Sequence, residues 1–257
     1  MAFADLDVLM DLCEGMVRRA AAHILSTCSR DVQFFTEYVD EGCKERLERS
    51  VRTPFHRITY TAAVDAIVSL QQETQQEDSP SLAVLQNMFL RAGEGDATGR
   101  GKWVGELRKK AKELVPLQWG DDLMREHERF ICETLCEGNG VFLTHYPQQI
   151  KPFYMRASEC ADPAKATVEC MDLLMPYVGE MAGGSVREER EQVLRENIRR
   201  QGLTEEGYDW YLDLRKHGSV PHGGFGLGYD RMVQWVTGVQ NIRDVVPIPR
   251  HKGYCKF

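Results

Sequence analysis

The sequence lacks the features that mark membrane-spanning and exported proteins. No apolar stretch among its 257 residues approaches the length of a membrane-spanning helix, so no membrane partner is expected. The acidic, amphipathic start MAFADLDVLMDLCEG has neither the basic beginning of a secretory signal nor the Arg- and Ser-rich composition of a transit peptide. We therefore expect a cytoplasmic protein, and an organellar location remains an alternative.

Paired cysteine motifs are also missing. None of the eight cysteines belongs to a CxxC motif, so a structural zinc site is not expected. They are scattered through apolar or amphipathic stretches, which is typical of reduced cysteines in a cytosolic-type compartment. Cys132 and Cys136 lie one helical turn apart, and we expect both to be buried by packing.

The chain has no excess of positive charge. The chain has 32 Lys and Arg against 39 Asp and Glu, which gives a formal net charge of −7. Bulk charge therefore does not point to a nucleic-acid partner, and an RNA would need a local basic patch. The run Arg108, Lys109, Lys110 and Lys112 is one such patch, although a solvated helix face is the simpler interpretation. No Ser–His or Cys–His arrangement for nucleophilic catalysis is evident.

The spacing of apolar residues predicts a mixed α and β chain. Helices are expected at about 3–27, 32–51, 61–72, 121–137, 187–202 and 204–218, and again from 229. The first should bury Leu12 and Met16, and Thr61 should cap the third. Strands are expected at 56–60, 140–147, 151–157, 166–176 and 178–185. Short loops between consecutive strands favour antiparallel pairing.

One region interrupts this pattern. Residues 74–101 are polar and rich in glycine, and they surround one short apolar run at 82–90. Together with the basic run that follows, they predict an insertion or surface loop region over 74–118, with a short helix at 82–90.

The stretch PHGGFGLGYDRMVQW, residues 221–235, combines four glycines with the start of a helix. Arg231 lies in the first turn, where the partial positive charge of the helix N-terminus disfavours a cation unless an anion is near. Glycines allow backbone N–H groups to approach a ligand closely. The stretch therefore suggests a site for a polyanion such as a nucleotide phosphate. The alternative is a tight strand-to-helix turn in which Arg231 pairs with Asp230 or with a neighbouring helix.

A second group of residues precedes this stretch. Asp172 and Glu180 are carboxylates on neighbouring predicted strands, and together they could hold Mg²⁺ beside nucleotide phosphates. Gly183 and Gly184 leave room where a bulky ligand could approach. Arg187 follows at the start of a predicted helix, which again suggests an anionic or carbonyl partner.

Together these segments resemble a known family. GEMAGGSVREER, HGGFGLGYDRMVQWVTGVQNIRDVVPIPR, WGDDLMREHERF and YPQQIKPFYMR are similar to class II aminoacyl-tRNA synthetases of the Asp/Asn/Lys subgroup, with the asparaginyl enzymes as the best match. The resemblance extends from Met1 to about Arg250, apart from the insertion after Thr74. It implies an α+β fold, with an antiparallel sheet flanked by helices and incomplete at its N-terminal side. Residues 1–257 would form part of a catalytic domain, and 74–118 would be an insertion within it.

The resemblance also implies a function, which is ATP-dependent activation of asparagine and its transfer to tRNA(Asn). Arg231 would hold the γ-phosphate of ATP, and Gly228 would let the adenine lie against the backbone, in a turn that includes Tyr229 and Asp230. Glu180 would hold Mg²⁺ and phosphate, with help from Asp172.

The amino-acid pocket would involve other residues. Arg187 would bind the side-chain carbonyl of asparagine. The floor and the walls would be formed by the residues Gly183, Gly184, His222 and Gly224. Glu126 and Arg129 would support the wall, while Tyr154 and Arg156 either face the site or are a core tyrosine and a solvent arginine.

This sequence departs from the family pattern in three ways. One is the insertion after Thr74, whose role the sequence does not indicate. Asp230 occupies a position where asparaginyl enzymes usually have Glu. In the family, MAFADL directly follows the second signature motif. The arginine that clamps the α-phosphate, the dimer-forming first motif and the anticodon-binding barrel would therefore lie upstream of Met1.

We accordingly expect a sheet with an exposed edge, little ATP–pyrophosphate exchange from this chain alone, and no firm basis for the family's homodimer. A non-catalytic relative or fragment that binds a nucleotide, an amino acid or a protein is the alternative. An aspartyl-type or asparagine-synthetase-like protein is a lesser one.

Overall fold

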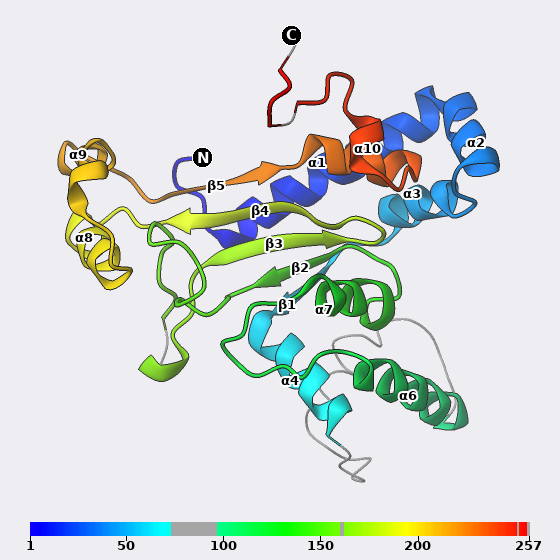
Figure 1. Cartoon of the computed structure of the whole chain (residues 1–257), viewed down its shortest axis with the longest axis horizontal. Coiled ribbons are helices and arrows are strands. Elements are labelled where there is room, and N and C mark those ends of the chain that lie inside the picture. Colours follow the sequence, from blue (N-terminus) through cyan, green and yellow to red (C-terminus); the bar gives the residue numbers. More distant parts are fainter. Residues whose placement is uncertain (73–96, 160–161, 251, 256–257) are drawn as a thin grey trace.

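The computed structural model describes residues 1–72, 97–159, 162–250 and 252–255, and the side chains of 97–103 are not included. Five strands form one sheet in sequence order (Figure 1): β1 (His56–Thr59), β2 (Val141–Thr144), β3 (Cys170–Met175), β4 (Gly179–Arg187) and β5 (His222–Leu227). β1 and β2 are parallel, and the other neighbours are antiparallel. The antiparallel prediction therefore holds for β2 to β5, and the β1–β2 pair makes the sheet mixed.

Helices cover both faces of the sheet. The α-helices are α1 (Leu6–Thr27), α2 (Ser29–Tyr38), α3 (Cys43–Arg52), α4 (Tyr60–Gln71), α6 (Ala97–Lys112), α7 (Arg125–Arg129), α8 (Glu191–Arg200), α9 (Asp209–Lys216) and α10 (Tyr229–Thr237). Shorter turns of helix are η1 (Phe130–Leu135), η2 (Pro163–Lys165), η3 (Glu205–Gly207) and η4 (Ile242–Val245). Among the described helices, none is both long enough and apolar enough to cross a membrane.

Strand alternation sorts the core into two layers. Val141 and Leu143 of β2 pack with α4, α6 and η1, whereas Phe142 between them packs with α1, α3 and α10. This is the period-two pattern expected for a strand with helices on both faces. A third, smaller cluster joins α8 to α9 through Leu194, Ile198 and Leu212. In Figure 1 these two helices lie apart from the other helices, near the end of β4 and the start of β5.

Most predicted elements form, with several corrections. The helix predicted at 32–51 is two helices, α2 and α3. The helix predicted from 187 begins only at Glu191, so Arg187 ends strand β4 and does not lie at the start of a helix. Residues 151–157 are not a strand, because only isolated bridges at Met155 and Ala157 connect them to other segments. The cap of α4 is Thr59, whose side chain accepts a hydrogen bond from the Ala62 N–H, and not Thr61. The predicted helix at 121–137 begins only at Arg125 and continues as the π-helical η1.

The last correction concerns α1. Leu12 and Met16 are exposed, and Leu9, Cys13 and Val17 are the buried residues instead. Leu12 and Met16 belong to the apolar side of α1, but this apolar side is wider than the part of the helix that packs against the sheet. The predicted open edge of the sheet is β5. On the outer side of this strand, Ala2 forms an isolated β-bridge with His222.

The region predicted as an insertion is only partly visible. The expected helix at 82–90 lies outside the described residues. Helix α6 follows, and its Leu107 and Ala111 are buried in the core while Lys109 and Lys110 are exposed. The described end of the region is therefore a packed helix with a solvated basic face. Cys132 and Cys136 are buried, as predicted.

Two glycines test the packing of the sheet. A Cβ on Gly184 would lie 2.5 Å from Cβ of Phe225 and 2.7 Å from the Gly224 carbonyl oxygen, whereas a Cβ on Gly226 would meet nothing within 4 Å. We expect Gly184→Ala to lower the free energy of unfolding by about 1–3 kcal/mol through overpacking. Gly226→Ala is the matched control on β5, with little or no loss. Urea unfolding checks this, and equal stability of the two variants would contradict it.

Candidate functional site

The face of β3, β4 and β5 that is opposite to α1 carries most of the predicted site residues. Across the strands, Asp172 pairs with Gly183 and Arg187 pairs with His222. Side chains on one face recur every second residue, so Asp172, Gly183 and Arg187 share this face with Gly224 and His222. The alternate residues point into the α1 layer; they include Met171, Leu173, Ala182 and Val186.

Arg231 and Glu180 meet at one end of β4. Helix α10 starts directly after β5, and the Gly228 N–H donates to the Met181 carbonyl at 2.8 Å. Arg231 donates to the Glu180 backbone carbonyl, and its Nη1 lies 3.6 Å from Oε2 of Glu180. Both side chains are 44% exposed. The carboxylate beside Arg231 thus belongs to a strand residue and not to Asp230.

Lys151 and Asp172 form a second ion pair in the middle of the same face. Nζ of Lys151 is 2.6 Å from Oδ2 of Asp172 and 3.9 Å from the ring centre of Tyr146. Burial alone would lower the pKa of Lys151, but the adjacent Asp172 carboxylate raises it above its usual value. We did not predict Lys151, since the segment at 151–157 was interpreted as a strand; a lysine directly before the apolar run PFYM was the available signal.

The carboxylates of these two pairs lie close to each other, and a third carboxylate lies near them. The point where a Cβ would lie on Gly183 is 2.9 Å from Oε1 of Glu180 and 3.1 Å from Oδ1 of Asp172. These two oxygens therefore approach one small space, and carboxylate oxygens are the donors that Mg²⁺ prefers. The third carboxylate is Glu128, which was not predicted as a site residue. Burial, and then the charges of Glu180 and Asp172, raise the pKa of Glu128 to about 7.

The described residues hold no group of three His, Cys, Asp or Glu side chains arranged to bind a metal ion. Any ion bound here would therefore need ligands beyond the protein, such as phosphate oxygens.

Arg187 lies at the other end of β4, in an aromatic cavity of about 680 Å³. Its guanidinium carbon is 4.5 Å from the ring centre of Tyr154. His222 and Gly224 line the same cavity, and Nδ1 of His222 lies 2.8 Å from the Val220 carbonyl oxygen. A separate cavity of about 420 Å³ contains Glu128, Glu180 and Arg231. The structure thus places Arg187 on the same face as the Arg231–Glu180 pair, but not in contact with it.

Of the other residues predicted near the amino-acid pocket, one faces the site and three do not line the Arg187 cavity. Tyr154 faces the site, while Arg156 pairs with Glu189 at 3.4 Å. Arg129 pairs with Glu133 at 2.7 Å and lines a third cavity together with Glu126.

The glycines and the turn before α10 also differ among themselves. A Cβ on Gly184 would point to the α1 side, into Phe225. The need for a glycine at this position is therefore explained by packing within the sheet, and not by space for a ligand. Gly183 faces the carboxylates, and Gly224 has open space around it. Tyr229, at the start of α10, is 72% exposed.

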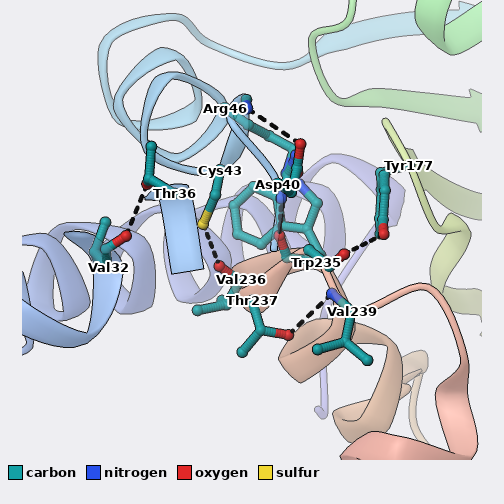
Figure 2. Close-up of polar contacts among 12 residues, drawn as sticks. Val32, Thr36, Asp40, Cys43, Arg46, Tyr177, Trp235, Val236, Thr237 and Val239 are labelled. Carbon is teal, nitrogen blue, oxygen red and sulfur yellow. Dashed lines mark hydrogen bonds and ion pairs between the residues drawn. The ribbon is translucent and has the colours of Figure 1, made fainter. Parts of the chain in front are cut away.

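The far end of α10 is held by polar contacts from α3 and from the β3–β4 turn (Figure 2). Arg46 donates from Nε and Nη2 to the Trp235 carbonyl at 3.0 and 2.9 Å, and its Nη1 pairs with Asp40. Cys43 Sγ donates to the Val236 carbonyl, and the Tyr177 hydroxyl donates to the Gly238 carbonyl. These donors satisfy carbonyls that a helix C-terminus leaves without partners, and Arg46 also complements the helix dipole. They fix the direction of the helix that carries Arg231.

This clamp predicts a stability effect. Arg46→Ala would leave Asp40 and the Trp235 carbonyl without their partner in a largely buried place, so we expect a loss of about 3 kcal/mol in unfolding free energy. Arg46→Lys should lose less. Arg52→Ala removes an exposed i,i+4 pair with Glu48 on the same helix and should cost under about 0.5 kcal/mol. Urea denaturation measures the unfolding free energy of all three variants. If Arg46→Ala lost no more unfolding free energy than Arg52→Ala, the proposed role of Arg46 in holding the end of α10 would be wrong.

The raised pKa of Glu128 predicts a pH effect. Between the ordinary value of 4.5 and about 7, the folded chain holds a proton on Glu128 that the unfolded chain has released. Stability should therefore fall as pH rises through this window. In Glu128→Gln this contribution is absent, so the variant should gain stability relative to the wild type from pH 5 to 8. Urea unfolding in metal-free buffer tests this prediction, and parallel pH profiles would contradict it.

Comparison with known proteins bears on this arrangement. The chain is 41% identical to a protein named "Probable asparagine–tRNA ligase, mitochondrial" from Dictyostelium discoideum and 40% identical to the asparagine–tRNA ligase of Clostridium tetani. All of the chain is aligned, against 47% and 46% of those proteins. The chain therefore spans about half the length of the curated relatives it matches.

Solved structures agree with these matches. The asparaginyl-tRNA synthetase from Pyrococcus horikoshii is 29% identical with a TM-score of 0.70, over 98% of this chain and 48% of that one. The complex of that synthetase with asparaginyl-adenylate has a TM-score of 0.69, over 99% of this chain and 46% of that one. These similarities confirm the α+β synthetase fold and the resemblance to asparaginyl enzymes.

The family model described as "tRNA synthetases class II (D, K and N)" matches residues 1–252. That match covers all five strands and every candidate site residue named above. The chain belongs to the class II tRNA synthetase family of the D, K and N type.

Proposed function

We propose that this chain supplies the asparagine- and ATP-binding part of an asparagine–tRNA ligase, which forms asparaginyl-adenylate and transfers asparagine to tRNA(Asn). One observation carries the proposal: Arg187 and the Arg231–Glu180 pair lie at opposite ends of one open strand face. Glu180 and Arg187 are seven residues apart on β4, which corresponds to roughly 20 Å along a strand. Asparagine and ATP, held next to each other for this reaction, together form an elongated ligand with the asparagine amide at one end and the polyphosphate and adenine towards the other.

Arg231 and the glycines of β5 and its turn suit the phosphate end. In this protein Arg231 contacts Glu180, and 44% of each side chain is accessible, so the guanidinium can turn to a phosphate without leaving a buried partner behind. Glu180 and Asp172 would hold Mg²⁺, which would offset phosphate charge when bound. Lys151 holds Asp172 in place between the two ends.

The chemistry requires positioning more than proton transfer. The asparagine carboxylate oxygen attacks the α-phosphorus of ATP, a new P–O bond forms, and the bond to pyrophosphate breaks. A hydroxyl of the terminal tRNA ribose then attacks the acyl carbon, and AMP leaves. Cations and backbone donors held in place stabilise the charge that develops at phosphorus. Gly228, Tyr229 and Asp230 are proposed to border the adenine.

Arg187 suits the amide end. Its guanidinium rests on the Tyr154 ring, and no ion pair joins it to a carboxylate within the described part of the chain. A guanidinium donates to a carbonyl oxygen and equally to a carboxylate, so aspartate is the competing substrate. Binding of an adenylate analogue without any exchange activity would instead favour the non-catalytic alternative.

Two features of the proposal concern the cell. Free cysteines in the described core fit a reducing compartment, and cytoplasm is the proposed location, with an organelle as the alternative because one relative is named as mitochondrial. A homodimer is proposed only for the longer family proteins.

The two arginines should separate ATP binding from asparagine binding. We expect Arg231→Ala to lower affinity for ATP about ten- to hundredfold, the loss of a hydrogen bond to a charged group. Arg187→Ala should leave ATP affinity unchanged and weaken a non-hydrolysable asparaginyl-adenylate analogue by a similar factor. Calorimetric titration measures both affinities, and the corresponding aspartyl analogue tests specificity.

Arg199→Ala is the control for this experiment, because Arg199 is an exposed arginine of α8 that pairs with Glu205 and lines neither cavity. If both site variants were folded and bound ATP and the analogue like this control, the proposed function would lose its basis.

A further inference from the structure

The cavity beside Arg187 offers more apolar surface than asparagine requires. Its volume is about 680 Å³, and five aromatic side chains line it: Phe153, Tyr154, Tyr208, Trp210 and Tyr211. Asparagine presents only a short polar amide, which Arg187 and Tyr154 can contact by themselves. The remaining aromatic wall thus has no role in the site described so far.

The outer part of this wall is formed by Trp210 and Leu214 of α9. They are one helical turn apart, and both line the cavity although they are 67% and 56% exposed. An isolated exposed apolar residue is ordinary, but two that face a shared cavity indicate a surface for a partner.

This wall is rigidly held. Arg215, one turn from Tyr211, is buried; it donates to the Glu188 carbonyl at 3.2 Å and to the Tyr211 hydroxyl at 2.8 Å. Leu212 packs into the α8–α9 cluster. The exposed indole of Trp210 is therefore carried on a fixed helix and does not depend on a loop for its position.

We propose that the wall formed by Trp210 and Leu214 receives the terminal base of the tRNA acceptor end by stacking. This inference rests on the proposed function. In the transfer step a ribose hydroxyl must come within about 3–3.5 Å of the acyl carbon. The base of that same nucleotide is one glycosidic bond away, so it must lie close to the asparagine pocket. Stacking of unpaired bases on aromatic side chains is a general mode of single-strand recognition.

Charge favours the α9 side over the opposite side of the site. Glu128, Asp172 and Glu180 gather at the Arg231 end and would repel the phosphates of an incoming RNA strand. The exposed charged residues of α9 are Asp209, Asp213 and Lys216, while Arg215 is buried, so α9 carries little net charge. An RNA end that reaches the cavity over α9 would therefore meet less repulsion than one that crosses the carboxylates at the Arg231 end.

The test uses a short acceptor-end RNA whose terminal base is the fluorescent analogue 2-aminopurine, added to the chain with the asparaginyl-adenylate analogue bound. We expect stacking to quench the fluorescence. Trp210→Ala should weaken RNA binding about five- to hundredfold and abolish the quenching, while Trp210→Phe should retain most of both. Tyr38→Ala is the matched control, because Tyr38 is equally exposed, at 68%, and lies on α2 outside the cavity.

The possible outcomes separate this inference from the proposed function. Failure of the wild-type chain to bind the adenylate analogue would count against the proposed function itself. Normal analogue binding in Trp210→Ala, together with selective loss of RNA binding, supports the inference. If the analogue binds but the terminal base is not quenched, or if Trp210→Ala binds RNA like Tyr38→Ala, the inference is wrong. The wall would then be a surface for a protein segment.

Discussion

The pairing of β4 with β3 on one side and β5 on the other is the constraint on which the candidate site depends. One face of β4 must be buried against α1, which commits Ala182 and Val186 to the core. Strand alternation then leaves Gly183 and Arg187 on the opposite face, beside Asp172 of β3 and the glycines of β5. A one-residue slip would exchange the two faces, so the same packing that stabilises the core also orients the site.

Arg231 is positioned by a second, independent route. It is carried by α10 and not by a strand, and its place follows from where that helix begins and where it points. Gly228 ties the start of α10 to Met181 of β4, and Arg46 holds the carbonyl of Trp235 near its end. The helix is therefore fixed to the sheet at one end and to α3 at the other. A guanidinium that is itself 44% exposed thus acquires a defined direction from contacts that are mostly buried.

Sequence patterns predicted the elements better than the contacts between them. Glycines followed by an amphipathic helix correctly indicated α10, because turn chemistry and apolar spacing are local properties, whereas β5 was not among the predicted strands. The parallel pairing of β1 with β2 was not predictable in this way, since it depends on a long connection that returns the chain to the same edge. Lys151 and Glu128 were missed for the same reason. Their importance comes from Asp172 and Glu180, which approach them only in the folded chain.

The distribution of charge along the open face suggests why the two ends can serve different parts of one ligand. At the Arg231 end the carboxyl groups of Glu128, Asp172 and Glu180 outnumber the two cations Arg231 and Lys151, although Glu128 is partly protonated near neutral pH because its pKa is raised to about 7. Such a place binds a polyphosphate poorly by itself and well together with a divalent cation, which would reverse the local excess of negative charge. At the Arg187 end the cation lies among aromatic rings, where lower effective polarity strengthens each hydrogen bond to a neutral amide. Binding at the first end would therefore depend on the metal concentration and binding at the second would not, although both are built on the same strand.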